Sequence, residues 1–164
     1  MKNIIFIASY PKSGNTWVRI IISLLIYAST VSKIKNLKKF DFKKLNGIDM
    51  ISKLKFFKNI DGYKLQEDGL LDSSFTINNW INAQKIINKN SKINFFKTHN
   101  MGGKINGKNF TNSDVCGGFI YITRDPRDVA ISKAKYMNTS IDVSIDRMLN
   151  DTSRIIHPGK VIEY

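Results

Sequence analysis

The chain has 164 residues and a formal net charge of +13 at neutral pH, from 26 basic and 13 acidic side chains. This length is enough for one domain with its own core, and the ordinary hydrophobic content argues against a disordered chain. The single cysteine, Cys116, excludes a disulfide framework or a cysteine-based metal site within one chain. We expect Cys116 to be a buried structural thiol, and its isolation suits a reducing compartment.

The excess positive charge has two interpretations. It consists mostly of lysines spread along the chain, which favours solvated surface residues. The other interpretation is a positive field that attracts a polyanionic nucleotide. A nucleic-acid-binding protein is a further, less favoured alternative, because the sequence contains no recognition helix, zinc finger or RNA-binding aromatic signature.

Two apolar runs near the N-terminus are too short to act as membrane spans. Residues 4–8 are shorter than the apolar part of a signal peptide, and residues 17–27 include Arg19 and Ser23. We therefore expect a protein without a membrane span, located in the cytoplasm.

The first 29 residues have the pattern of an α/β nucleotide-binding unit. Residues 3–8 form a continuous Ile-rich run, which predicts a strand buried on both faces. Residues 9–15 form a loop that contains Pro and Gly. Residues 16–29 are apolar nearly all round and predict a buried helix. A strand, a loop of small residues and a helix in this order open a parallel α/β fold.

The rest of the chain predicts more strands and helices. Residues 30–75 mix charged and isolated apolar residues, and we expect short helices and loops there, as an insertion that caps a site. The later elements are expected as a helix over 77–90, a strand over 93–97, a loop over 98–117, a strand over 118–123, a helix from Pro126 to about 137 with Asp125 as its N-cap, a helix over 141–149, and a loop around His157, to which no role is assigned.

The loop between the first strand and the first helix is suited to an anion. The N-terminus of a helix offers free N–H groups and a partial positive charge, and Gly14 lets the backbone approach a ligand closely. Ser13, Asn15 and Thr16 add side-chain donors, and Lys12 adds a mobile cation. The loop is not a Walker loop, because its lysine precedes the glycine and no earlier glycine exists.

A second anion-binding turn follows the strand over 118–123. Arg124 stands at the carboxyl end of that strand, where open α/β sheets bind ligands, and its guanidinium can form paired hydrogen bonds with a phosphate. Ser132, two turns into the next helix, could add a hydroxyl. Arg127 and Asp128 are better explained as surface charge and helix capping.

His99 follows the strand over 93–97 and is a candidate general base. Histidine side chains in general titrate near neutral pH, so one at this place can accept a proton from an attacking group. A lone histidine is more often structural, and its place at a strand end favours the catalytic role. Lys12 and Lys97 could neutralise charge that develops on the reacting oxygens. No metal is expected, because these cations could supply the charge and no ligand cluster is present.

Together these segments resemble the sulfotransferase family. Residues 10–17 match its usual phosphosulfate loop, Tyr-Pro-Lys-Ser-Gly-Thr-Thr-Trp, with Asn15 replacing the first Thr. Residues 124–132 match its 3′-phosphate signature, Arg-Asn/Asp-Pro-x-Asp-x-x-x-Ser. Residues 97–99 match the Lys-Thr-His of its cytosolic branch. The resemblance implies a three-layer α/β/α fold of the P-loop type around a parallel sheet.

The resemblance also implies a donor and the roles of the site residues. The donor is 3′-phosphoadenosine 5′-phosphosulfate (PAPS), which leaves as 3′-phosphoadenosine 5′-phosphate (PAP). His99 would be the base with Lys97 nearby. The donor contacts are then Lys12 at the bridging oxygen, Ser13, Gly14, Asn15 and Thr16 at the 5′-phosphate, Trp17 on adenine, and Arg124 and Ser132 at the 3′-phosphate. A structural interpretation of Trp17, as a core residue, remains open.

Two departures from the family bear on substrate and completeness. The spacing from Lys12 to His99 is longer than in the cytosolic enzymes, and is similar to bacterial sulfotransferase-domain proteins with an insertion there. Nothing after Ser132 matches the family's C-terminal half, so we expect one truncated domain over 1–164. It would act on a small-molecule or glycan acceptor. The sequence leaves open whether the protein forms a homo-oligomer. The alternative is a remnant that binds PAP or PAPS without turnover.

Overall fold

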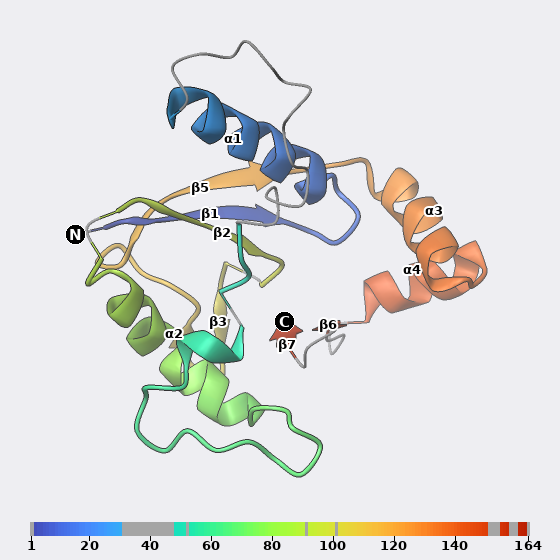
Figure 1. Ribbon diagram of the computed structural model, residues 1–164. Helices are drawn as coiled ribbons and strands as arrows, with labels where there is room; N and C mark the ends of the chain where they lie inside the picture. The colour runs from blue at the N-terminus through green and yellow to red at the C-terminus, as the bar shows by residue number, and fades with distance from the viewer. Residues whose placement is uncertain are drawn as a thin grey trace.

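A parallel three-stranded sheet forms the centre of the protein (Figure 1). The computed structural model describes residues 2–30, 48–51, 53–90, 92–100, 102–150, 155–157 and 161–163. The central strand β1 (Ile4–Ser9) pairs with β2 (Asn94–Thr98) on one side and with β5 (Cys116–Ile122) on the other. These are the three strands that the sequence predicts, and their parallel pairing confirms the α/β fold class.

Two helices cover opposite faces of this sheet (Figure 1). Helix α1 (Asn15–Thr30) lies on one face and α2 (Ser73–Ile87) on the other. Phe6 turns toward α2 and Ile7 toward the other face, and both are fully buried, which confirms the prediction that the first strand is buried on both sides. The core on the α2 side consists of Ile4, Phe6, Ile51, Phe57, Leu71, Ile77, Trp80, Ala83, Phe96 and Phe110.

Helix α1 forms where the sequence predicts it, but the prediction that it is buried was wrong. Trp17, Ile21 and Leu25 are 73%, 53% and 64% exposed and follow one another at helical spacing. The reason is that α1 carries apolar side chains on nearly all of its faces, whereas the described part of the chain packs against only one of them.

Helix α2 begins at Ser73, earlier than the predicted start at 77, because Asp72 caps it. The Asp72 carboxylate accepts a hydrogen bond from the N–H of Phe75 at 2.8 Å. Gln84 in the same helix is fully buried, and its amide nitrogen donates to the carbonyl oxygen of Phe110 at 2.6 Å. This bond ties α2 to the segment that leads into β5.

The predicted loop over 98–117 contains a small hairpin. Strands β3 (Lys104–Ile105) and β4 (Lys108–Asn109) pair antiparallel around Asn106 and Gly107, both with positive φ. An Asn-Gly pair is the strongest short hairpin signal, and positive φ at both positions is what the tight type I′ turn requires. The segment before α2 contains one short helical turn, η3 (Leu54–Phe56); residues 31–47 of the predicted insertion lie outside the described residues.

Two helices follow the sheet at the carboxyl end of β5 (Figure 1). Helix α3 (Pro126–Met137) is capped by Asp125, whose carboxylate accepts from the N–H of Arg127, and α4 (Ile141–Leu149) has its predicted bounds. The buried Ser144 hydroxyl donates to the Ala130 carbonyl at 2.9 Å and holds the two helices together. Strands β6 (Ile155–His157) and β7 (Val161–Glu163) pair antiparallel, so His157 lies in a strand and not in the predicted loop.

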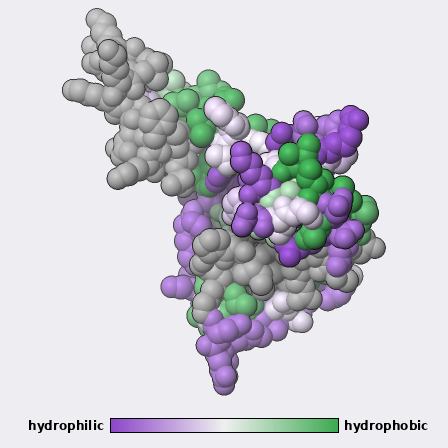
Figure 2. Space-filling view, turned by 90° about the vertical axis from the view of Figure 1, so that its right-hand side faces the viewer, coloured by the Kyte–Doolittle hydropathy of each residue, from purple (hydrophilic) through white to green (hydrophobic). Residues whose placement is uncertain are grey.

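Apolar side chains are exposed at the end of the molecule that carries α3 and α4. Figure 2 turns this end to the viewer, and hydrophobic groups are bordered there by hydrophilic ones. Ile141, Ile145 and Leu149 of α4 are 49%, 40% and 75% exposed. No helix in the described part of the chain is both long and apolar enough to cross a lipid bilayer.

The cysteine thiol is less buried than expected. Cys116, at the start of β5, is half-buried, and its Sγ lies 3.3 Å from the carbonyl oxygen of Gly118. Burial raises the pKa of this thiol, against smaller opposing effects of hydrogen bonds with Gly118 and Thr111. A thiol with a raised pKa is a poor nucleophile at neutral pH, which fits a structural role.

Candidate functional site

The three predicted motifs lie at the same end of the sheet, because each follows the carboxyl end of a parallel strand. The loop of residues 10–14 follows β1, His99 follows β2, and Arg124 follows β5. Since β1 is paired with both other strands, the loop after β1 has the other two segments on either side. The carboxyl ends of strands are where open α/β sheets bind their ligands.

The loop after β1 has an unusual backbone. Lys12 and Gly14 both have positive φ, 68° and 101°. Left-handed backbone at a non-glycine residue is costly and is concentrated at ligand sites. A β-carbon at Gly14 would meet no atom within 4 Å, so the backbone here borders open space.

Helix α1 begins directly after this loop and contributes a positive end. Its first N–H groups have no partner within the helix, and its first turn carries no acidic side chain. Thr16 in that turn is exposed, and Ser13 just before it is buried. The loop and helix end together fit an anion such as a phosphate.

The Asn15 side chain has partners within the protein, and not the free donor position that the sequence predicts. Its side chain is only 6% exposed, and its amide nitrogen donates to the carbonyl oxygen of Ile7 at 3.0 Å and to Ser9 Oγ at 3.2 Å. Both amide hydrogens are therefore used inside the protein. Any hydrogen bond from Asn15 to a phosphate would come from its backbone N–H.

Arg124 joins the two turns that the sequence predicts to bind anions. Its Nη1 donates a hydrogen bond to the main-chain carbonyl of Lys12 at 3.1 Å, and its Nε lies 3.8 Å from the Asp128 carboxylate. The side chain is 41% exposed, so much of the guanidinium faces solvent. Ser132, in the second turn of α3, is half-buried.

Helix α3 also contacts the loop through two residues that sequence reasoning missed. The Lys12 ammonium lies 4.3 Å from the centre of the Tyr136 ring, and Lys133 Nζ donates to the Tyr10 hydroxyl at 3.2 Å. A signal was available, because Tyr136 is four residues after Ser132 and so lies on the same side of the helix.

His99 lies against the end of β1. Its Nδ1 is 2.7 Å from the carbonyl oxygen of Ser9 and 3.4 Å from Ser9 Oγ. A carbonyl oxygen only accepts, so Nδ1 carries the hydrogen of this bond. In the neutral imidazole, Nε2 is then the nitrogen that can accept a proton.

Lys97 is buried beside the segment that precedes η3. Its ammonium lies 3.4 Å from Met50 Sδ, and its N–H donates to the carbonyl oxygen of Asp49 at 2.9 Å. Residues 48–50 thus run along the outer side of β2 near its carboxyl end. Lys97 precedes His99 by two residues, and its ammonium is directed to this segment.

The two tryptophans differ in environment. Trp17 is 73% exposed in the first turn of α1, whereas Trp80 is buried in the core at 2%. The interpretation of Trp17 as a core residue was therefore wrong. An exposed indole directly after the loop of residues 10–14 could stack on an aromatic ligand.

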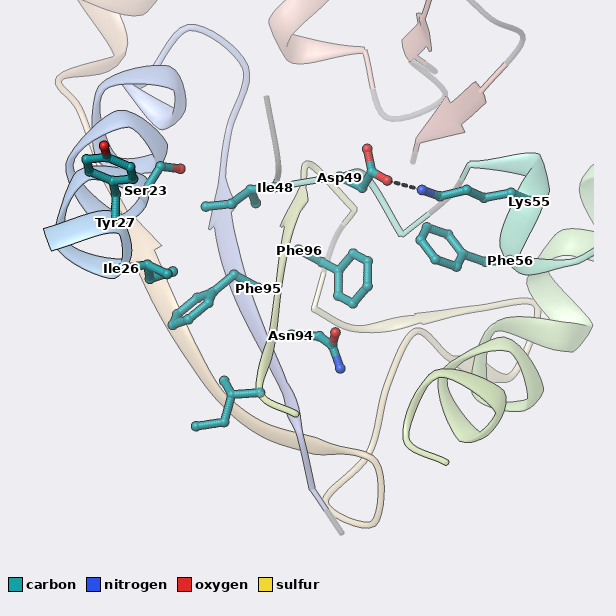
Figure 3. A pocket seen from close by; sticks show the side chains of 11 residues that line it. Ser23, Ile26, Tyr27, Ile48, Asp49, Lys55, Phe56, Asn94, Phe95 and Phe96 are labelled. Carbon is teal, nitrogen blue, oxygen red and sulfur yellow. Dashed lines mark hydrogen bonds and ion pairs between the residues drawn. The ribbon is translucent and has the colours of Figure 1, made fainter. Parts of the chain in front are cut away.

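A cavity of about 530 Å³ opens at the outer edge of β2 (Figure 3). Phe95 points to the α1 side of the strand, and Phe96 points to Phe56 on the other side. The lining residues from β2 belong to its beginning, while His99 follows its end. This cavity is thus separate from the three motifs.

The described ranges contain no group of three or more histidine, cysteine, aspartate or glutamate side chains that could hold a metal ion.

A comparison with curated proteins gives no significant match. The family model of the sulfotransferase domain matches residues 2–160. Because this match covers nearly the whole chain and includes all three motifs, the protein belongs to the sulfotransferase domain family.

Proposed function

We propose that this protein transfers the sulfuryl group of PAPS to an acceptor hydroxyl or amine. The observation that carries the proposal is the 3.1 Å hydrogen bond from Arg124 Nη1 to the Lys12 carbonyl. It joins two anion-binding turns on neighbouring strands. One adenosine ligand with phosphates at its 5′ and 3′ positions requires two such turns side by side.

The residues present fit this donor. The loop of residues 12–16 and the start of α1 would hold the 5′-phosphosulfate through backbone N–H groups and the hydroxyls of Ser13 and Thr16. Arg124 and Ser132 would hold the 3′-phosphate, with Arg124 able to form two parallel hydrogen bonds. The exposed Trp17 ring would stack on adenine.

The reaction we propose is an in-line displacement at sulfur. The acceptor oxygen or nitrogen forms a bond to sulfur while the bond from sulfur to the bridging phosphate oxygen breaks, and that electron pair leaves with PAP. His99 Nε2 takes the proton of the acceptor. The Lys12 ammonium neutralises the charge that grows on the leaving oxygen. Positioning and electrostatics supply most of the catalysis, by analogy with phosphoryl transfer.

The acceptor we propose is a small molecule or a glycan, and the location is the cytoplasm. Donor binding by a sulfotransferase of this kind needs no metal, because Lys12 and Arg124 supply positive charge at both ends of the nucleotide.

Thermal unfolding in the presence of PAP or AMP tests the donor site. PAP at a hundredfold excess over its Kd should stabilise the protein by about 2.7 kcal/mol. For a chain of this size, the melting temperature should then rise by roughly 5–10 °C. AMP, which lacks the 3′-phosphate, should give a clearly smaller shift. Equal shifts would remove the assigned roles of Arg124 and Ser132.

Transfer from radiolabelled PAPS to a panel of phenols, amines and sugars tests the reaction. His99→Ala should lose about 10²–10⁴ in rate, the usual contribution of a general base, and should keep the PAP-induced thermal shift. Wild-type protein that binds PAP but transfers to no acceptor would instead support the remnant that binds without turnover. Unchanged transfer by His99→Ala would exclude His99 as the base.

A further inference from the structure

Asn15 is a buried polar residue at the junction of the anion-binding loop and α1. Its side chain is 6% exposed, and one amide nitrogen makes both of its described bonds, to the Ile7 carbonyl and to Ser9 Oγ. These bonds reach back over the loop to the last residues of β1. Asn15 therefore fixes the end of β1 relative to the start of α1.

The same end of β1 holds the imidazole of His99. Ser9, only 4% exposed, accepts from His99 Nδ1 through its carbonyl oxygen, with its Oγ 3.4 Å from the same nitrogen. Asn15 thus contacts a residue whose carbonyl and hydroxyl both face His99. Asn15 Nδ2 donates to Ser9 Oγ, and His99 Nδ1 donates to the carbonyl oxygen of the same residue.

The oxygen of the Asn15 amide differs from the nitrogen of the same group. Oδ1 is buried and has no hydrogen-bond partner. A buried acceptor without a partner lowers stability, and each such group in a native protein calls for an explanation. Turning the amide over would place Oδ1 against the Ile7 carbonyl, where two acceptors would repel. The unpaired oxygen is thus a consequence of keeping the donor pointed at Ile7 and Ser9.

We propose that Asn15 is a positioning residue that acts on His99 through Ser9. It holds Ser9 so that the hydrogen of the neutral imidazole stays on Nδ1, which leaves Nε2 as the proton acceptor. The catalytic part of this inference rests on the proposed function, in which His99 is the base. The tautomer of a histidine is set by the bond that its other nitrogen makes, so loosening Ser9 would let the hydrogen move to Nε2.

The test compares Asn15→Thr with Asn15→Val, two side chains of the same shape that differ in one hydroxyl. The readout is the ¹⁵N NMR spectrum of the imidazole nitrogens at a pH where they are neutral, with a His99→Ala sample to identify the signals of His157, the second histidine. Wild type and Asn15→Thr should show one tautomer, with the hydrogen on Nδ1. Asn15→Val, which lacks a donor, should show a mixture or the Nε2–H form.

A matched control exists at the other end of the sheet. Asn88 also ties elements together, donating to the Val115 carbonyl at 2.7 Å and accepting from the N–H of Asn3 at 3.0 Å. Asn88→Val should lower stability and leave the His99 tautomer unchanged. A change of tautomer in this control would mean that general loosening, and not the bond to Ser9, moves the hydrogen.

Transfer kinetics complete the test. Asn15→Val should lower kcat about tenfold relative to Asn15→Thr, part of the 10²–10⁴ that a general base supplies. A wild-type imidazole with its hydrogen on Nε2, or an unchanged tautomer in Asn15→Val, would overturn the inference. If Asn15→Val does not fold, Asn15→Ala replaces it with the same expectation.

The NMR result needs neither donor nor acceptor, so it separates this inference from the proposed function. Absence of any sulfuryl transfer together with the expected tautomer change would refute the enzyme and keep the positioning by Asn15. A tautomer change with unchanged kcat would refute the catalytic link.

Discussion

A β-carbon on Gly117 would lie 2.5 Å from the carbonyl oxygen of Lys2. This close approach occurs where β5 pairs with β1: Ile4 lies opposite Cys116 and Ile5 opposite Gly118, so Gly117 is the extra residue of a bulge. The pairing that brings Arg124 beside the β1 loop thus depends on a residue without a side chain at this point.

Gly117→Ala should destabilise the protein by about 1–3 kcal/mol, the usual cost of forcing an extra carbon into a filled space. The clash is with main-chain atoms, which cannot rotate away. Gly118→Ala is the matched control, because a β-carbon there would meet no atom within 4 Å. Urea unfolding of the two variants measures the difference, and equal stabilities would contradict the register of β5 on β1.

Local signals in the sequence predicted the elements that carry the site. The Ile-rich run before the loop predicted β1, and Asp125 with Pro126 predicted the start of α3 to the residue. Both signals depend on neighbouring residues only. The convergence of the loop and Arg124 was also predictable, because parallel strands place their carboxyl ends at one edge.

Features that depend on long-range packing were not predictable. The burial of a helix depends on which elements cover it, so the apolar pattern of α1 did not indicate that Trp17 and Leu25 are exposed. The sequence offered Asn15 as a ligand for phosphate, whereas its side chain folds back onto Ile7 and Ser9. The contact of Lys12 with Tyr136 likewise arises from the placement of α3.

Arg124→Ala should remove most of the advantage of PAP over AMP in thermal stabilisation. A hydrogen bond between charged groups contributes about 1.5–3 kcal/mol, which corresponds to a loss in PAP affinity of roughly 10- to 100-fold. AMP binding should change little. Arg127→Ala is the control, because Arg127 is 88% exposed and pairs with Asp125 at 2.6 Å. A similar loss in both variants would assign the effect to net charge.

PAP binding should quench the fluorescence of Trp17. The exposed indole would stack on adenine, and such stacking contributes about 1–3 kcal/mol per base. Trp80 is the only other tryptophan and serves as an internal reference, since it is buried in the core. Trp17→Phe should abolish the PAP-dependent change and keep the Trp80 emission. A change that persists in Trp17→Phe would place adenine elsewhere.

The pH dependence of stability should report the ion pairs of Asp49 with Lys53 and Lys55. Burial alone would raise the pKa of Asp49, but hydrogen bonds and charge from Lys53 and Lys55 together hold the pKa below its ordinary value (Figure 3). A carboxyl group with a lowered pKa in the folded state stabilises the protein above the unfolded value, about pH 4. That stabilisation is lost as the pH falls through the lower folded value.

Asp49→Asn should therefore be less stable than wild type at pH 7, by about 0.5–1 kcal/mol because both lysines are largely exposed to solvent. The difference should shrink below pH 4 and vanish once the wild-type carboxylate is protonated. Denaturant unfolding of both proteins between pH 2.5 and pH 7 (roughly the titration range of carboxylates) measures it. Asp61→Asn is a suitable control, because the Asp61 carboxylate contacts the N–H of Gly62 on the exposed surface. A difference in stability between Asp49→Asn and wild type that stays constant down to the lowest pH would show that the charge of Asp49 does not stabilise the protein.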